Sequence, residues 1–259
     1  MTVERDQVLA AHFDAFHLAR DRSPLVSALY ADAMGDGYPV DVAPYSSCDW
    51  TVLGALVAGL RVRPGGVVAD VGCGTGGAGL WLARALQAGL VGVDVSPAAV
   101  RIASARRARF GMTGRARFTV GTLEATGLPD GSVDGVVCVD ALANAGDRVQ
   151  ALAEMRRIVQ PGGRLVMTRA GTGGLRDRVV EQAAAAGLDV EDVQKRPDEP
   201  AMWGRLYRLW RARAGELREA VGEDQAAGML REAERMLPRL EGRVALLVTL
   251  RRPGPPVAR

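Results

Sequence analysis

The sequence predicts a doubly wound α/β fold, with helices on both faces of a mainly parallel sheet. Short apolar segments alternate with helical patterns along most of the chain, and this order is typical of parallel strands joined by helical crossovers. A glycine-rich turn, Gly72 to Gly77, follows the first apolar segment. Glycines allow a ligand to approach the backbone closely, so we expect a binding site at the carboxyl ends of the strands.

Helices are expected at the start of the chain, over residues 4–20 and 24–34. The first would carry four aromatic side chains on one face, namely His12, Phe13, Phe16 and His17. An irregular segment over 37–49, rich in Tyr, Pro, Ser and Asp, separates these helices from a third one over 50–60.

The apolar segments predict seven strands, near residues 67–71, 90–94, 116–120, 134–139, 164–169, 187–193 and 243–251. Helices are expected between them, after the glycine turn to about residue 87, over 97–111, over 147–159 and over 173–186. The dipeptide Ser96-Pro97 supports one of these helices, because serine is a favourable N-cap and proline a favourable first helical residue.

The interval 197–241 is longer than a connection between two strands requires, and we expect it to form two helices. Apolar side chains recur at helical spacing on both, at Trp203, Leu206, Tyr207 and Trp210, then at Met229, Leu230, Ala233, Met236 and Leu237. These stripes either pack on the body of the domain or cover a bound substrate. We therefore divide the chain into an N-terminal helical segment or lid (1–50), a nucleotide-binding core (51–196), a helical insertion and possible substrate cap (197–241), and the last strand with its tail (242–259).

Bulk composition favours a cytoplasmic enzyme. Of 259 residues 48% are hydrophobic, yet no apolar run approaches the length of a membrane span, and the first residues lack the profile of a signal peptide. The odd number of cysteines, three, favours reduced thiols. The 33 basic residues are interspersed with 30 acids, which is typical of solvated helix faces. We expect neither a nucleic-acid nor a membrane partner, and a monomer or homodimer.

Two acids flank the glycine turn. Asp70 lies inside the apolar run Val67–Val71, and Asp94 ends the next run, where it is placed to accept hydrogen bonds from ribose hydroxyls. Gly72, Gly74 and Gly77 also satisfy the dinucleotide pattern G-x-G-x-x-G. A carboxylate at Asp70 would repel a pyrophosphate, however, and would attract a ligand that carries an ammonium and a sulfonium group.

The pattern Asp-x-Gly-x-Gly-x-Gly from Asp70 resembles the first motif of class I S-adenosylmethionine (SAM) methyltransferases. The resemblance continues downstream through Gly121–Glu124, Leu128–Asp134 and Glu154–Leu165, and it covers about residues 50–170. The branch that methylates small metabolites is the most similar. The resemblance implies a Rossmann-like, seven-stranded sheet whose last strand is antiparallel.

The resemblance also implies the cofactor and its contacts. SAM would be bound as methyl donor, with S-adenosylhomocysteine (SAH) as the product. Asp70 would meet the amino end of its methionine part, and the backbone of Gly72, Cys73, Gly74 and Gly76 would approach the same part. Asp94 would take the ribose hydroxyls.

The adenine contacts depart from the family pattern. Val95 would lie against the ring, but Thr122 stands where the family usually has an acid for the adenine amine. Thr122 carries no charge, so the amide of Leu123 and apolar walls would replace the acid.

The acceptor end is less well defined by the sequence. Asp140, at the end of the fourth strand, would face the space between donor and acceptor, or would cap a turn. Asn144 stands where some family members have a histidine base. The candidate bases are therefore His17 or a tyrosine–aspartate arrangement that draws on Tyr30, Tyr38, Tyr45 and Asp49. An amine acceptor needs no strong base, and no His/Asp/Glu cluster predicts a metal site.

Other enzyme classes fit less well. A short-chain dehydrogenase needs Tyr-x-x-x-Lys, but the only lysine is Lys195 and position 191 is Glu. An adenine-N6 methyltransferase would have Pro-Pro-aromatic where Asp140–Ala143 stands. We expect a SAM-dependent methyltransferase that acts on an N, O or C atom of a small molecule in bacterial secondary metabolism. A methyltransferase-fold cyclase that binds SAM without consuming it is the alternative, and a gain of one methyl in the product would separate the two.

Overall fold

The computed structural model describes residues 2–254, so residue 1 and the tail residues 255–259 lie outside the described part. Its centre is a seven-stranded sheet in the order β3-β2-β1-β4-β5-β7-β6. The strands are β1 (Val67–Val71), β2 (Gly89–Asp94), β3 (Ala116–Val120), β4 (Val133–Cys138), β5 (Val159–Gly171), β6 (Asp189–Lys195) and β7 (Val244–Arg251). The first five pair in parallel, and β7 runs antiparallel to both β5 and β6. The predicted doubly wound fold is confirmed.

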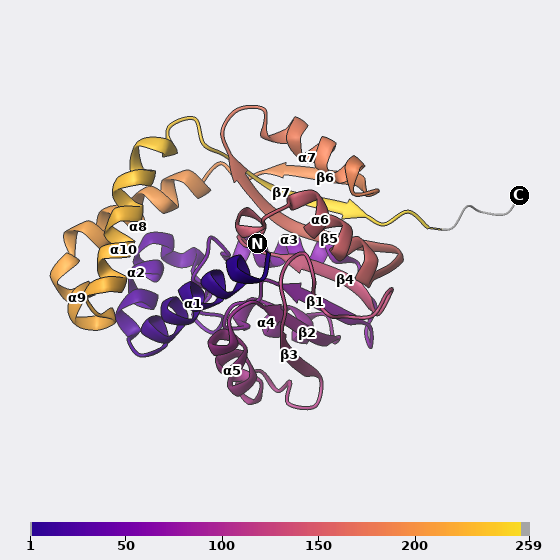
Figure 1. The fold of residues 1–259 in the computed structure, drawn as a ribbon, viewed down its shortest axis with the longest axis horizontal. Coiled ribbons are helices and arrows are strands. Elements are labelled where there is room, and N and C mark those ends of the chain that lie inside the picture. Colours follow the sequence, from indigo (N-terminus) through magenta and orange to yellow (C-terminus); the bar gives the residue numbers. More distant parts are fainter. Residues whose placement is uncertain (1, 255–259) are drawn as a thin grey trace, which may run out of the picture.

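Helices cover both faces of the sheet (Figure 1): α3 (Trp50–Leu60), α4 (Gly77–Ala85), α5 (Pro97–Arg106), α6 (Arg148–Ile158) and α7 (Leu175–Ala185). Neighbouring strand residues point to opposite faces. Val136 packs in the cluster that contains α6 and α7, whereas Val137 packs in the cluster that contains α3. This alternation requires apolar residues at successive positions of a central strand, which explains its continuous apolar run.

The helices begin where the sequence supplies caps. The Asp49 carboxylate accepts the amide of Val52, and the Ser96 hydroxyl accepts that of Ala99. Both caps satisfy amides that have no partner within the first turn of a helix. The cap at Asp49 fixes where α3 begins and so where the preceding segment 42–48 enters the core.

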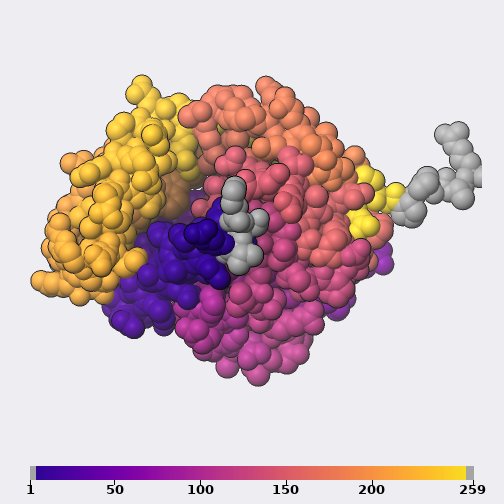
Figure 2. Space-filling view, in the orientation of Figure 1, coloured from indigo at the N-terminus to yellow at the C-terminus, as the bar shows by residue number. Residues whose placement is uncertain are grey.

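A second group of helices lies beside the sheet (Figures 1 and 2): α1 (Thr2–Asp21), α2 (Pro24–Met34), α8 (Glu199–Ala212), α9 (Ala214–Val221) and α10 (Glu223–Met236). These helices share one hydrophobic cluster, in which Leu29 and Tyr30 of α2 pack with Leu206 and Trp210 of α8. We call α8, α9 and α10 the cap helices. The N-terminal segment and the insertion therefore form one packed unit.

The prediction of two helices in the insertion is wrong, because three are present. Arg213, with φ −110° and ψ 33°, interrupts the first helix. Gly222, with φ 84°, separates α9 from α10. Strand β5 also begins at Val159, five residues earlier than expected, because Val159 pairs with Val133 before the Pro161-Gly162-Gly163 turn shifts the register.

Among residues 2–254, none of the helices combines the length and apolar character needed to cross a membrane. Cys48, Cys73 and Cys138 are buried free thiols.

Candidate functional site

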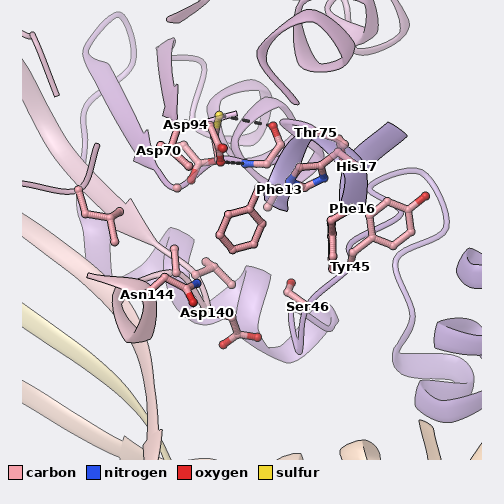
Figure 3. A pocket seen from close by; sticks show the side chains of 18 of the residues that line it. Phe13, Phe16, His17, Tyr45, Ser46, Asp70, Thr75, Asp94, Asp140 and Asn144 are labelled. Carbon is pink, nitrogen blue, oxygen red and sulfur yellow. Dashed lines mark hydrogen bonds between the residues drawn. The ribbon is translucent and has the colours of Figure 1, made fainter. Parts of the chain in front are cut away.

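A pocket lies at the carboxyl ends of β1 to β4, beneath α1 (Figure 3). Its walls come from the glycine turn, from the strand ends, from segment 42–46 and from one face of α1. That α1 face contributes Asp6, Leu9, Phe13, Phe16 and His17. Side chains at this spacing share one side of a helix, so α1 presents a continuous surface to the pocket.

Asp70 is 3% exposed at the end of β1 and lines the pocket. Burial and, to a smaller extent, the nearby Asp94 raise the pKa of this carboxyl to about 7, against a hydrogen bond from the Gly79 amide that lowers it. No ion pair joins either carboxylate to a cationic side chain of the described residues. A cationic ligand group would therefore be stabilised here.

Asp94 ends β2, and its carboxylate accepts one backbone amide from the glycine turn and one from the loop after β2. Its Oδ2 accepts the Gly74 amide at 2.7 Å (Figure 3), and its Oδ1 accepts the Ser96 amide at 2.9 Å. Burial raises the pKa of the carboxyl, while these two hydrogen bonds oppose the rise. Asp94 thus holds the glycine turn against the next loop and still borders the pocket.

The first three amides of the glycine turn already have acceptors within the protein. The amides of Gly72 and Cys73 both donate to the Val93 carbonyl, and that of Gly74 donates to Asp94. Gly74 has φ 51°, and a Cβ atom there would lie 3.3 Å from the His17 ring. Gly72, Cys73 and Gly74 line the pocket, whereas Gly76 lies outside its lining and precedes α4.

Asp140 lines the pocket just after β4, in the left-handed conformation with φ 51°. Its Oδ2 accepts both the amide and the hydroxyl of Ser47, at 2.7 and 2.6 Å. Its Oδ1 accepts the Thr168 hydroxyl at 2.6 Å. Arg196 extends the network by donating to the hydroxyl and the carbonyl of Ser47. The carboxylate is thereby occupied in tying segment 46–48 to the strand ends.

His17 lies over the glycine turn and is 7% exposed. Its Nδ1 atom is buried without a hydrogen-bond partner among the described residues. Burial and, to a smaller extent, Arg20 lower its pKa to about 4 against a small opposing effect of Asp14. The ring is therefore neutral at pH 7. A buried polar atom without a partner is unusual.

The other predicted acceptor-end residues are only partly brought together. Tyr45 and Asn144 line the pocket, and the Tyr45 hydroxyl donates to the Arg20 carbonyl at 3.2 Å. Tyr30 does not line the pocket, since it is 2% exposed and packs among Trp203 and Trp210. Burial raises the pKa of the Tyr30 hydroxyl strongly. Tyr30 thus belongs to the core that joins α2 to the cap helices.

The predicted adenine-side residues Val95, Thr122 and Leu123 all line the pocket. The Thr122 hydroxyl accepts the amide of Ala125 and so stabilises its own turn. Sequence reasoning missed Glu124, which follows Leu123 in the lining. The spacing of Phe13 and Phe16 on α1 could have identified Asp6 and Leu9, which occupy the same helical face.

Two sets of polar contacts hold α1 over the pocket. The Asp14 carboxylate accepts the Ser96 hydroxyl and, at 2.8 Å, the Ala98 amide at the start of α5. Near the other end of α1, Arg5 donates to the Asn144 carbonyl at 2.8 Å and lies 3.8 Å from the Glu124 carboxylate. We call these contacts the α5 latch and the Glu124 latch.

No group of three His, Cys, Asp or Glu residues within the described chain is arranged to hold a metal ion.

Part of the chain is similar in sequence to known methyltransferases. Residues 69–167 match the methyltransferase domain family. Methyltransferase GfsG of Streptomyces halstedii is 31% identical over 146 residues, which are 55% of this chain and 52% of that protein. The ubiquinone/menaquinone biosynthesis C-methyltransferase UbiE of Geobacter sulfurreducens is 36% identical over 110 residues, 42% of this chain and 43% of that protein. The chain spans about half the length of these curated relatives.

Solved structures share the fold over more of the chain. The [4+2]-cyclase SpnF superposes with a TM-score of 0.76 at 20% identity, over 96% of this chain and 97% of that chain. A SAM-dependent methyltransferase from Geobacter sulfurreducens, solved with SAH, gives a TM-score of 0.61 at 18% identity, over 86% and 97%. At these identities the likeness establishes the fold alone.

Proposed function

We propose that the protein is a class I, SAM-dependent methyltransferase, which transfers a methyl group from SAM to an N, O or C atom of a small molecule; the match of residues 69–167 to the methyltransferase domain family supports this. The observation that carries the proposal is the pair of buried carboxylates, Asp70 and Asp94, beside the glycine turn of the matched segment. SAM carries an ammonium and a sulfonium group, and it has ribose hydroxyls for an acid to bind.

The residues around the pocket fit this cofactor. Asp70 would hold the amino end of the methionine part, because no ion pair joins its carboxylate to a cationic side chain of the described residues. Asp94 would accept from the ribose hydroxyls with the lone pairs that its two backbone hydrogen bonds leave free. Cys73 would meet the cofactor through its backbone, and Gly76 would act only by shaping the turn.

At the adenine end, Val95 and Leu123 offer apolar contact and Thr122 lacks the charge that the family usually places there. We propose that Glu124 compensates for Thr122, since it brings a carboxylate to the same wall of the pocket. Its Oε1 already accepts the Gly146 amide, which fixes the side chain while Oε2 stays available.

Bound SAM would supply an activated methyl carbon, so the protein's task is to position the acceptor and exclude water. Asp140 would position segment 46–48, and with it Tyr45, rather than remove a proton, because its oxygens are engaged by Ser47 and Thr168. Tyr45, Asn144 and the neutral His17 remain the groups that would contact the acceptor. A base with a pKa of about 4 is weak, so the acceptor would enter as a good nucleophile.

We further propose that segment 1–50 acts as a lid whose moving part is α1, and that the insertion 197–241 caps the acceptor. α1 covers the pocket and is held by two latches made of a few polar contacts. Contacts of this kind open more readily than an apolar interface. α2 and the cap helices share one core, so they would form the fixed wall against which α1 closes.

The substrate is proposed to be a small, largely apolar molecule of bacterial secondary metabolism. The wall opposite the strand ends consists of Leu9, Phe13 and Phe16, with Tyr45 beside them. Flat apolar rings bind such surfaces well. The relative GfsG from Streptomyces is consistent with this setting.

A methyltransferase-fold cyclase that keeps SAM bound is the second candidate. The specific observation in its favour is the shortage of a base, since the Asp140 carboxylate is engaged and His17 is weakly basic. A cycloaddition needs no proton acceptor, whereas methylation of a phenol does.

The test is a substrate screen of the full chain with SAM labelled in its methyl group. Transfer of label into a product whose mass rises by one methyl, with one SAH released for each product, is the expected result. A product of unchanged mass formed only when SAM is present would replace methyl transfer by the cyclase function. Absence of SAM and SAH binding by calorimetry would reject both.

A further inference from the structure

Arg20, near the end of α1, is a buried cation without an ion-pair partner. It is 2% exposed, and no salt bridge within the described part of the chain includes it. Within residues 2–254 its Nε atom is buried without a hydrogen-bond partner, and Nη1 donates only to the Phe16 carbonyl at 3.2 Å. A guanidinium has five N–H donors, and leaving them unmet inside a protein is costly.

Nearby groups compensate the charge only weakly. Burial lowers the pKa of Arg20, and electrostatic interactions with Tyr30, Glu232 and Tyr45 oppose this effect without cancelling it. The Glu232 carboxylate is already bound by the Tyr207 hydroxyl at 3.0 Å. The buried carboxylate of Glu199, by contrast, receives two hydrogen bonds from Arg243.

Arg20 lies directly behind the wall of the cofactor pocket. Its guanidinium carbon is 3.3 Å from the centroid of the Phe16 ring, and Phe16 lines the pocket (Figure 3). The Tyr45 hydroxyl, on the neighbouring stretch of wall, donates to the Arg20 carbonyl. Arg20 is not among the lining residues, so its guanidinium would reach the pocket, beside Phe16 and Tyr45, only after a rotation of the Phe16 side chain.

We propose that Arg20 is the acceptor-recognition residue, and that it binds a negatively charged oxygen, a carboxylate or an enolate, on the methyl acceptor. This inference rests on the proposed function, because it assumes that an acceptor binds beside the cofactor. The guanidinium fork matches two oxygens of such a group. The pocket then offers carboxylates to the cationic donor and a guanidinium to an anionic acceptor.

A functional cation without an ion-pair partner has a measurable signature in stability. Replacing it by an apolar side chain of similar length removes the desolvation penalty. Arg20→Met should therefore raise the melting temperature of the full chain. The matched control is Arg243→Met, which breaks a buried ion pair with Glu199 and should lower the melting temperature.

Binding is tested on the full chain saturated with SAH, by calorimetry with 2-naphthoate and 2-naphthalenemethanol as probes. These probes share the ring and differ in charge. The wild type should bind naphthoate at least about tenfold more tightly, the effect of one charge-assisted hydrogen bond. Arg20→Met should lose this preference, and Arg20→Lys, which keeps the charge, should retain part of it.

The inference is overturned if the alcohol binds as well as the acid, if naphthoate does not bind, if Arg20→Met keeps the preference, or if that variant is destabilised like Arg243→Met. Should Arg20→Met fail to fold, it counts as destabilised, and Arg20→Lys still reports the preference. SAH affinity is measured in the same samples. Its absence in the wild type would instead reject the proposed function.

Discussion

Asp140 and Ser47 are joined by two hydrogen bonds to one carboxylate oxygen, across 93 residues of sequence. One bond comes from the backbone and one from the side chain, so the Ser47 residue as a whole is fixed relative to the end of β4. Ser47 is 1% exposed. The segment that carries Tyr45 to the pocket is therefore positioned by a strand-end acid, whose left-handed backbone directs it away from the strand.

Ser47→Ala tests this role. It removes the hydroxyl that donates to Asp140 and accepts from Arg196, and the free energy of unfolding should fall by about 1–2 kcal/mol. Turnover should fall more than SAH affinity does, because the segment positions the acceptor side. Urea denaturation and calorimetry measure the two effects. Ser132→Ala is the control, since the buried Ser132 hydroxyl has no partner among the described residues and its loss should cost nothing. Equal effects of the two variants would contradict the role of Ser47.

Asp94→Ala should weaken SAM binding by about 1–3 kcal/mol, the cost of leaving ribose hydroxyls and the Gly74 amide without an acceptor. Calorimetry checks this. Asp134→Ala removes a carboxylate that likewise accepts a backbone amide, that of Val67, but at the other end of β1. We expect that variant to lose stability and to keep its SAM affinity. Unchanged SAM affinity in Asp94→Ala would show that the ribose lies elsewhere.

Gly74→Val should abolish SAM binding while the protein still folds. The new side chain would be strained at φ 51° and would press on His17, 3.3 Å from its Cβ. Gly65→Val carries a similar strain, at φ 84°, with nothing within 4 Å of its Cβ. The two variants should therefore lose similar stability in thermal melts, and only Gly74→Val should lose binding. Normal SAM affinity in Gly74→Val would mean that the turn does not face the ligand.

Asp70 should make SAM affinity depend on pH. Its pKa of about 7 in the empty pocket means that a cationic ligand must displace a proton below that pH. Affinity should therefore rise about tenfold from pH 6 to pH 8, with proton release visible in calorimetry with two buffers of different ionisation enthalpy. Asp70→Asn should lose the part of the pH dependence that comes from the Asp70 carboxyl. Any titration of SAM itself affects the wild type and the variant equally. If SAM affinity depends on pH in the same way in the wild type and in Asp70→Asn, the assigned role of Asp70 is contradicted.

The raised pKa of Asp70 makes folding stability change with pH in the opposite direction from SAM affinity. The folded-state pKa lies above the unfolded value, so the folded protein binds more protons. The contribution of Asp70 to stability is fully present below about pH 4 and is lost as the pH rises through about 7.

The lid proposal is tested at the α5 latch. Asp14→Ala removes the acceptor for Ser96 and Ala98, so α1 should exchange its amide hydrogens faster and SAH should slow the exchange less than in the wild type. Asp21→Ala, at the end of the same helix, is the control. Point variants serve better than deletion of residues 1–35, because that deletion also removes Leu29 and Tyr30 from the core shared with the cap helices. Equal exchange of α1 with and without SAH in the wild type would show that α1 is scaffold.

Local patterns predicted the core well because its signals lie within single elements. The run Val67–Val71 with the glycines after it specifies a strand, a turn and the start of a helix without reference to the rest of the chain. The break between α8 and α9 at Arg213 could not be predicted from the sequence, because a single non-helical residue between two favourable helical sequences leaves no strong signal.

The site was predictable only where one motif supplied it. Asp70, Asp94, Gly72 and Gly74 come from one continuous stretch, and all four line the pocket, whereas Gly76 does not. Tyr30 and Tyr45 looked equivalent in sequence, yet the packing of α2 against α8 takes Tyr30 away from the pocket and leaves Tyr45 at its wall. Pairings such as Asp14 with Ser96 depend on how α1 crosses α5, and this crossing is decided by tertiary packing.

The position of β7 between β5 and β6 has a consequence for biosynthesis. β6 pairs with β7 alone, so residues 189–195 leave the ribosome with exposed backbone groups and wait until residues 244–251 have been synthesised. The cap helices are translated in this interval and can collapse onto α2 first. A nascent chain stalled before residue 244 would thus present a folded helical unit beside an open sheet edge, the form most exposed to chaperones and to aggregation.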